Sequence, residues 1–347
     1  MKNRNISLDI VRTIACIMVI VYHSPQPGVV NSLEASTASI IGVPCIGLFF
    51  MVSGYLLLPT KDSLFPFLKK RMNRILLPTL FWTAFYLLVN YIENGNYLGQ
   101  SWIQTFASIP FTRQGHGVLW FLYTITGIYI LSPILSAWLS NATKREVQFL
   151  LGLWGITLCF PYLRPFVILT EDVYGWLYYF SGFVGYFLLG YYIKMFKPTL
   201  SLITIMAMYF VPFVIAPLSK YAGIEVLYHS YDYLSLMVAM MCLGIFLFVI
   251  KVVSPSCVNN AFGIKILTSF SNCSFGVYLV HIFVMHKILW KMDILSSFGG
   301  TIQIILCGLF TTIISWIIVL LLSYLPNAEY IIGYKTNRNY ARTQHLT

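Results

Sequence analysis

The stretch SLDIVRTIACIMVIVYHS, residues 7–24, is apolar enough to cross a bilayer, although it contains Arg12 near its beginning and His23 near its end. The two residues are eleven positions apart, and the intervening rotation is about 1100°, about 20° more than three full turns. Both side chains are therefore predicted on one helix face, about 16 Å apart along the axis. A charged group at membrane depth is costly and normally faces a polar cavity or a partner. We expect this helix to form one wall of a buried site.

The composition excludes an ordinary soluble protein. Of the 347 residues, 58% are hydrophobic and 10% are charged, whereas soluble domains contain about 25% charged residues. The mean hydropathy is +0.77, and apolar segments recur along the chain, which predicts an all-α polytopic membrane protein whose residues 1–347 form a single membrane-embedded domain. The formal net charge is +11, but the basic residues lie in short loops, where membrane topology explains them better than nucleic-acid binding does.

We expect about ten membrane-spanning helices with both termini in the cytoplasm. Sixteen of the 22 lysines and arginines fall in the N-terminal tail, in alternate loops or in the C-terminal tail 325–347, whereas five fall on the opposite side and Arg12 lies within the first span. This asymmetry follows the positive-inside rule. The first span is expected to be retained rather than cleaved, because Arg12 interrupts its apolar core. The predicted spans are approximately residues 7–24, 38–58, 75–92, 118–139, 147–163, 175–193, 200–218, 231–250, 266–289 and 301–324.

The seven cysteines are scattered singly, and the sequence has no CxxC motif and no Cys/His cluster. A cysteine inside an apolar segment behaves as a small apolar residue. We therefore expect neither a metal site nor a disulfide framework.

His23 is the leading candidate for a general base. Desolvation near the membrane interior favours a neutral imidazole, which is able to accept a proton. The alternative is a histidine at a helix end that makes a structural hydrogen bond. Arg12 either lines the same site or pairs with Asp9, three residues earlier on the same face, and the two interpretations are compatible.

The basic run LKKRMNRILLP, residues 68–78, is the second candidate site. Arg71 and Arg74 are spaced i, i+3 at the start of a helix, and Lys70 adjoins them. Forked guanidinium donors on one helix side suit phosphate oxygens. The alternative is a cytoplasmic anchor that sets topology, with or without contacts to lipid phosphates.

Weaker candidates lie in other apolar segments. His281 follows Tyr278 by three residues in the ninth predicted span, and it either faces the same cavity or is satisfied by another helix. His116 lies just before Trp120 near the predicted outer surface, where acceptor binding or plain solvation would explain it. Small residues predict close helix packing at Ser53 and Gly54 and along Gly182, Gly185 and Gly190. Aromatic residues in the outer loops predict an interfacial belt or a sugar-binding surface, namely Tyr97, Trp102, Tyr221 and Tyr228.

Five segments in order resemble the acyltransferase 3 family, integral-membrane O-acyltransferases that act on surface polysaccharides and related acceptors. The resemblance covers about residues 5–325, nearly the whole chain. The segments are the Arg12/His23 pair, GLFFMVSGY at 47–55, KRMNR at 70–74, LWFLY at 119–123 and SFGVYLVH at 274–281.

The resemblance implies transfer of an acyl group, most often acetyl from cytoplasmic acetyl-CoA, to a hydroxyl of an outward-facing glycan. The family's span-1 arginine and histidine fall on Arg12 and His23, and its RxxR pair falls on Arg71 and Arg74. Acyl-CoA would be a co-substrate, with no bound cofactor. The partners would be acyl-CoA, a glycan or lipid-linked glycan and membrane lipids. The chain is similar to stand-alone members of the bacterial cytoplasmic (inner) membrane. Direct attack by the hydroxyl and a covalent acyl-histidine are both compatible with these residues.

One position departs from the family pattern, and two other functions compete. Many members place an aspartate or a proline two residues before the Phe-Phe pair, where this chain has Gly47. A glycosyltransferase would need outer-loop carboxylates, for which Glu171 and Asp172 are the adjacent acidic pair. A polysaccharide transporter would use the same buried charges as a substrate path.

Overall fold

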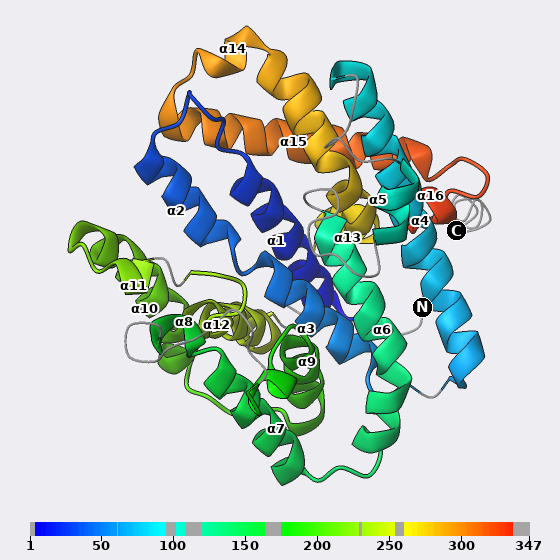
Figure 1. Cartoon of the computed structure of the whole chain (residues 1–347), viewed down its shortest axis with the longest axis vertical. Coiled ribbons are helices and arrows are strands. Elements are labelled where there is room, and N and C mark those ends of the chain that lie inside the picture. The colour runs from blue at the N-terminus through cyan, green and yellow to red at the C-terminus, as the bar shows by residue number, and fades with distance from the viewer. Residues whose placement is uncertain are drawn as a thin grey trace.

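A computed structural model describes residues 4–60, 62–94, 102–108, 119–163, 175–228, 231–253 and 260–335, and in this part of the chain it contains helices and no strand (Figure 1). The predicted all-α class is therefore confirmed for the described residues. The longer helices are α1 (Ile6–His23), α2 (Ser32–Gly42), α3 (Cys45–Leu57), α4 (Leu64–Asn94), α6 (Trp120–Leu139), α7 (Lys144–Thr157), α9 (Val184–Phe196), α10 (Leu202–Tyr221), α12 (Leu236–Val252), α13 (Ala261–Ile282) and α15 (Gly300–Leu322). Shorter elements are α5 (Trp102–Ser108), α8 (Phe160–Leu163), η2 (Tyr178–Phe180), α11 (Glu225–Tyr228), η4 (Phe283–Ile288), η5 (Leu289–Lys291), α14 (Asp293–Ser296) and α16 (Glu329–Ile332).

Seven helical segments in the described residues are long and apolar enough to cross a membrane, which makes the chain a multi-pass membrane protein. The 17-residue helix α12 is apolar but shorter. The expected number of about ten spans and the cytoplasmic termini stay predictions. The seven segments are Ile6–His23, Ser32–Leu57, Leu64–Glu93, Trp120–Leu139, Leu202–Tyr221, Ala261–Lys291 and Gly300–Leu322.

The fifth and sixth predicted spans correspond to shorter helices than expected. Helix α7 has only 14 residues, and it begins with a capping box in which Thr143 and Glu146 exchange hydrogen bonds. Helix α9 begins at Val184, nine residues after the predicted start, because Gly182 has a φ of +96° that interrupts a right-handed helix. A Cβ at Gly182 would meet no atom within 4 Å, so the packing role predicted for it is wrong and its role is conformational.

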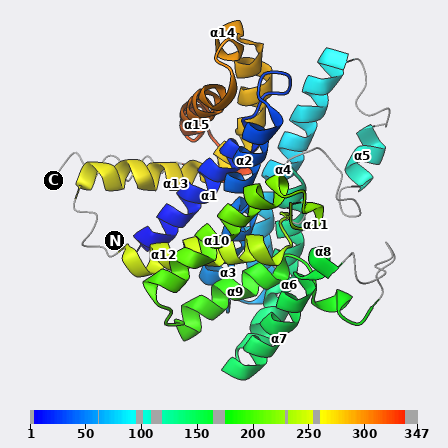
Figure 2. The same ribbon diagram turned by 90° about the vertical axis from the view of Figure 1, so that its left-hand side faces the viewer.

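Helix α1 runs through the middle of the bundle and packs against α2, α3, α12, α13 and α15 (Figure 1). In the second view, α15 lies on one side of α1, while α9, α10 and α12 lie on the other (Figure 2). The most buried side chains of α1 are small or branched, with Val11 and Ala15 at 0% and Cys16 at 1% exposure. Small side chains allow close approach of neighbouring helices where lipid supplies no hydrophobic driving force. The helix that carries Arg12 and His23 is therefore held on several sides.

Helices α3 and α9 meet through glycines. A Cβ at Gly54 would lie 1.7 Å from the Phe187 carbonyl oxygen, and a Cβ at Gly190 would lie 2.0 Å from that of Met51. Gly185 faces the Trp154 indole in the same way, at 2.1 Å. The small-residue packing predicted for these three glycines is confirmed.

We predict that Gly190→Ala destabilises the protein by about 1–3 kcal/mol, because the added methyl group forces the α3 and α9 backbones apart. The measurement is the midpoint temperature of thermal unfolding in detergent. Gly127→Ala in α6 is the matched control, since its Cβ would meet nothing within 4 Å and alanine is the better helix former. Equal midpoints for the two variants would contradict the close contact.

Candidate active site

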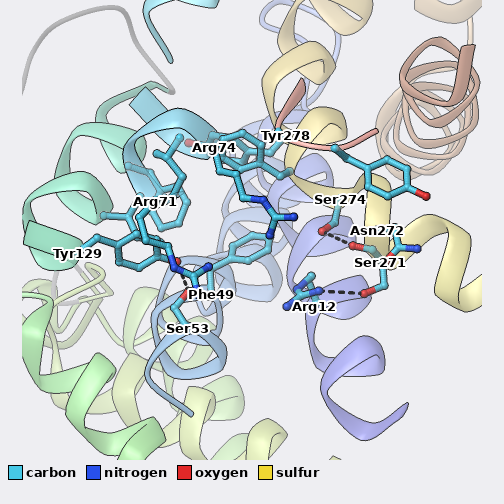
Figure 3. A pocket seen from close by; sticks show the side chains of 16 residues that line it. Arg12, Phe49, Ser53, Arg71, Arg74, Tyr129, Ser271, Asn272, Ser274 and Tyr278 are labelled. Atoms are coloured by element: carbon cyan, nitrogen blue, oxygen red, sulfur yellow. Dashed lines mark hydrogen bonds between the residues drawn. The ribbon is translucent and has the colours of Figure 1, made fainter. Parts of the chain in front are cut away.

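A cavity of about 380 Å³ lies where α1, α3, α4, α6 and α13 meet, and the segment that follows α16 closes one side. Three of its lining residues are arginines, two from α4 and one from α1, and they face it from opposite walls (Figure 3). The cavity thus brings together five residues that the sequence suggested separately. They are Arg12, Ser53, Arg71, Arg74 and Tyr278.

Arg12 is held by a buried carboxylate. The Ser271 hydroxyl donates to Asp9 Oδ1 at 2.7 Å, and Arg12 Nη1 lies 3.4 Å from Ser271 Oγ and 4.0 Å from Asp9 Oδ1. Arg4 also donates to both Asp9 oxygens, and its Nη2 reaches Asn272 Oδ1 at 3.0 Å. One carboxylate therefore serves two guanidinium groups, which leaves a net positive charge at this wall.

Arg71 and Arg74 have no carboxylate within ion-pair distance among the described residues. The guanidinium of Arg71 lies 5.6 Å from the centroid of the Phe67 ring, and its Nε is buried without a hydrogen-bond partner in the described part of the chain. A buried donor without an acceptor is costly and requires an explanation, such as a ligand. The α4 wall is therefore suited to an anion.

The end of the described chain completes the cavity beside Arg74. Pro78 has no N–H to donate to the Arg74 carbonyl four residues earlier. Gly333 packs there with a φ of +69°, and a Cβ at this position would lie 3.1 Å from that carbonyl oxygen and 2.6 Å from the Phe275 ring. The close approach requires glycine, and it places Tyr334 in the cavity wall. Helix α16 is fastened to α4 by Trp82, whose indole donates to the Ile331 carbonyl at 2.9 Å.

Two histidines meet beyond the cavity. Neither His23 nor His281 belongs to its described lining, yet their ring centroids lie 5.6 Å apart. Tyr278 connects the two regions, because it lines the cavity and its ring centroid is 5.5 Å from that of His281. Arg12 and His23 were predicted on one face of α1. In the structure, Arg12 lines the cavity near one end of the helix, whereas His23 lies beside His281 at the other end.

Other predicted site residues lie elsewhere. Lys70 is exposed and is not in the described lining. Trp120 packs against Phe183 and Tyr233, with ring centroids 5.4 and 5.3 Å away. Gly47 has no room for a side chain, because a Cβ would lie 2.5 Å from the Cys242 sulfur. His116, Tyr97, Glu171 and Asp172 lie outside the described residues, and the side chains of Trp102 and Tyr228 do as well.

Several lining residues were not anticipated. Tyr129, whose hydroxyl donates to Ser53 Oγ at 3.2 Å, stands in an apolar span without any pattern to mark it. Ser271 and Asn272 lie three and two residues before the SFGVYLVH segment, so its upstream flank was the available signal. Arg4, which does not line the cavity but contacts Asp9 and Asn272, was counted only as a topological charge.

These features define a multi-pass helical membrane protein whose bundle encloses a cationic, ligand-sized cavity. The family model described as an acyltransferase domain, Acyl_transf_3, matches residues 5–320. The chain therefore belongs to the acyltransferase 3 family and is a membrane acyltransferase. Comparison with curated proteins and with solved structures gave no match.

We predict that Asp9→Asn lowers the free energy of unfolding by about 1–3 kcal/mol, because Arg4 and Arg12 lose their shared counter-charge while both stay partly solvated. Thermal unfolding in detergent measures the effect. Asp293→Asn, at an exposed aspartate of α14, is the matched control and should unfold like the wild type. A similar midpoint for both variants would show that the carboxylate does not hold this wall together.

Proposed function

We propose that this chain is an O-acyltransferase of the bacterial cytoplasmic membrane that transfers acetyl from acetyl-CoA to a hydroxyl of an outward-facing cell-surface or lipid-linked glycan. The observation that carries the proposal is the cavity with three arginines, one of which, Arg71, has a buried Nε without a hydrogen-bond partner among the described residues. Acyl-CoA combines a strongly anionic nucleotide end with a thin arm, and this charge distribution matches the cavity.

The donor would lie with its phosphates against Arg71 and Arg74 and its arm along the apolar and aromatic wall. That wall contains Phe49, Phe121 and Ile125. The pantetheine arm, with two amide links between the diphosphate and the sulfur, is long enough to bridge the roughly 16 Å that eleven helical residues span. Because a thioester held at His23 would lie about 16 Å from Arg12 along the helix axis, we favour a role for Arg12 in orienting the donor over a role in polarising the thioester carbonyl.

His23 would act at the far end of the arm as the general base. The acceptor hydroxyl gives its proton to the imidazole, and its oxygen attacks the thioester carbonyl. The C–O ester bond forms, the C–S bond breaks, and the proton passes to the leaving thiolate to give free CoA. The closeness of His23 to a second histidine supports a proton-transfer role at this position.

We predict that Arg71→Gln raises the KM for acetyl-CoA about tenfold or more, because hydrogen bonds to charged groups contribute about 1.5–3 kcal/mol. Lys70→Gln, one residue away but exposed, should change KM by less than about twofold. The assay follows transfer of radiolabelled acetyl from acetyl-CoA to the glycans of membranes that contain each variant. Equal effects of the two substitutions would favour a topological anchor over donor binding.

We also predict that His23→Ala abolishes acylation of the host's surface glycans while the amount of protein in the membrane is unchanged. Mass spectrometry of glycans from cells with and without the protein measures the loss of one acyl increment. A transporter would instead change where the glycan is found and leave its acylation intact. Persistent acylation with His23→Ala would remove His23 from the mechanism.

A further inference from the structure

His281 lies at the point where α13 changes its winding. Helix α13 ends at Ile282 and continues as the π-helical segment Phe283–Ile288. The Phe283 N–H donates to the Val280 carbonyl, so the Leu279 carbonyl loses its usual helical donor, and the Tyr86 hydroxyl donates to it at 2.8 Å. A side chain from α4 thus fixes the backbone turn that carries His281. Such π segments are frequent at functional sites.

The hydrogen bonding of His281 determines which ring nitrogen carries its proton. Nδ1 lies 2.6 Å from the Tyr278 carbonyl oxygen, and a carbonyl oxygen accepts only, so Nδ1–H is the donor. In the neutral ring, Nε2 then carries a lone pair. This nitrogen is buried and has no partner among the described residues, and the side chain is 0% exposed. A fully buried acceptor left unpaired is destabilising, which points to a hydrogen bond that is formed only during function.

His23, the proposed catalytic base, is the candidate hydrogen-bond donor to this nitrogen. The His23 and His281 centroids are 5.6 Å apart, whereas two imidazoles joined by a direct N–H···N bond have centroids about 5 Å apart. Hydrogen bonds between catalytic groups are often long in the free enzyme and shorten when substrate binds.

We propose that His281 is the positioning residue of the catalytic base: its Nε2 accepts a hydrogen bond from the N–H of His23 in the substrate complex. The inference rests on the proposed function of His23. The bond fixes the His23 tautomer, so that the other nitrogen of His23 presents its lone pair to the acceptor hydroxyl. After proton transfer, the same bond stabilises the imidazolium until the proton passes to the thiolate. A base oriented by a third group is a recurring arrangement in enzymes that activate a hydroxyl.

The test substitutes His281 by phenylalanine, which keeps the ring contact with Tyr278 and removes the acceptor. Full-length protein in membranes is assayed with radiolabelled acetyl-CoA at saturating and limiting concentrations. We expect kcat to fall about tenfold or more, with the KM for acetyl-CoA unchanged. The unfolding midpoint should stay close to that of the wild type, because removal of the unpaired Nε2 offsets loss of the Nδ1–H bond to the Tyr278 carbonyl. His281→Gln restores an acceptor and should recover part of kcat.

His286→Phe is the matched control, because His286 stacks on Trp290 with centroids 3.9 Å apart and a phenylalanine keeps that stacking. It should leave kcat unchanged. A wild-type kcat in His281→Phe overturns the inference, as does a glutamine variant that is no better than the phenylalanine variant. If the wild type transfers no acetyl group at all, the proposed function itself fails.

A direct measurement covers the case in which the phenylalanine variant does not fold. An experimental structure of the wild type with a non-hydrolysable acetyl-CoA analogue bound should place a His23 nitrogen about 2.7–3.2 Å from His281 Nε2. Rings that remain apart, or a His281 Nε2 bonded to another group, would overturn the inference.

Discussion

Holding guanidinium groups inside an apolar bundle is the constraint on which this site depends. On α1, Asp9 meets it by accepting from Arg4 and Ser271 while lying within ion-pair distance of Arg12. On α4 no carboxylate of the described residues does the same for Arg71, whose Nε stays buried and unpaired. The bundle thus compensates the charge of the α1 wall in part and leaves that of the α4 wall for an anionic ligand to compensate.

Regular helix is interrupted at the cavity wall and again at the histidine pair beyond it. In a membrane, regular helices pair their backbone groups internally and leave none for other contacts. Pro78 frees the Arg74 carbonyl, Gly333 bends the chain against it, and the π segment after His281 frees the Leu279 carbonyl for Tyr86. Each interruption has a specific neighbour, so each one also fixes how two elements meet at the site.

Helical periodicity and the energetic cost of a charge in the membrane were sufficient to mark α1 and its two candidate residues, because both depend on local sequence and on depth in the membrane. The same arguments predicted the arginine pair of α4. They did not predict that the cavity ends before His23, or that Tyr129 and Asn272 line it, because those facts depend on how α6 and α13 pack against α1. The contact between His23 and His281 joins residues far apart in the chain, and the π segment that positions the second histidine has no sequence signature.

One end of the described chain contacts the cavity wall and the other end forms part of it. Arg4 contacts Asp9 and Asn272 just before α1 begins, and Tyr334 lines the cavity just after α16 ends. Affinity tags and fluorescent fusion partners for membrane proteins are commonly attached near such positions. For this protein, a tag joined without a spacer close to either residue would lie next to the cavity wall, so purification strategy and enzymatic competence are linked.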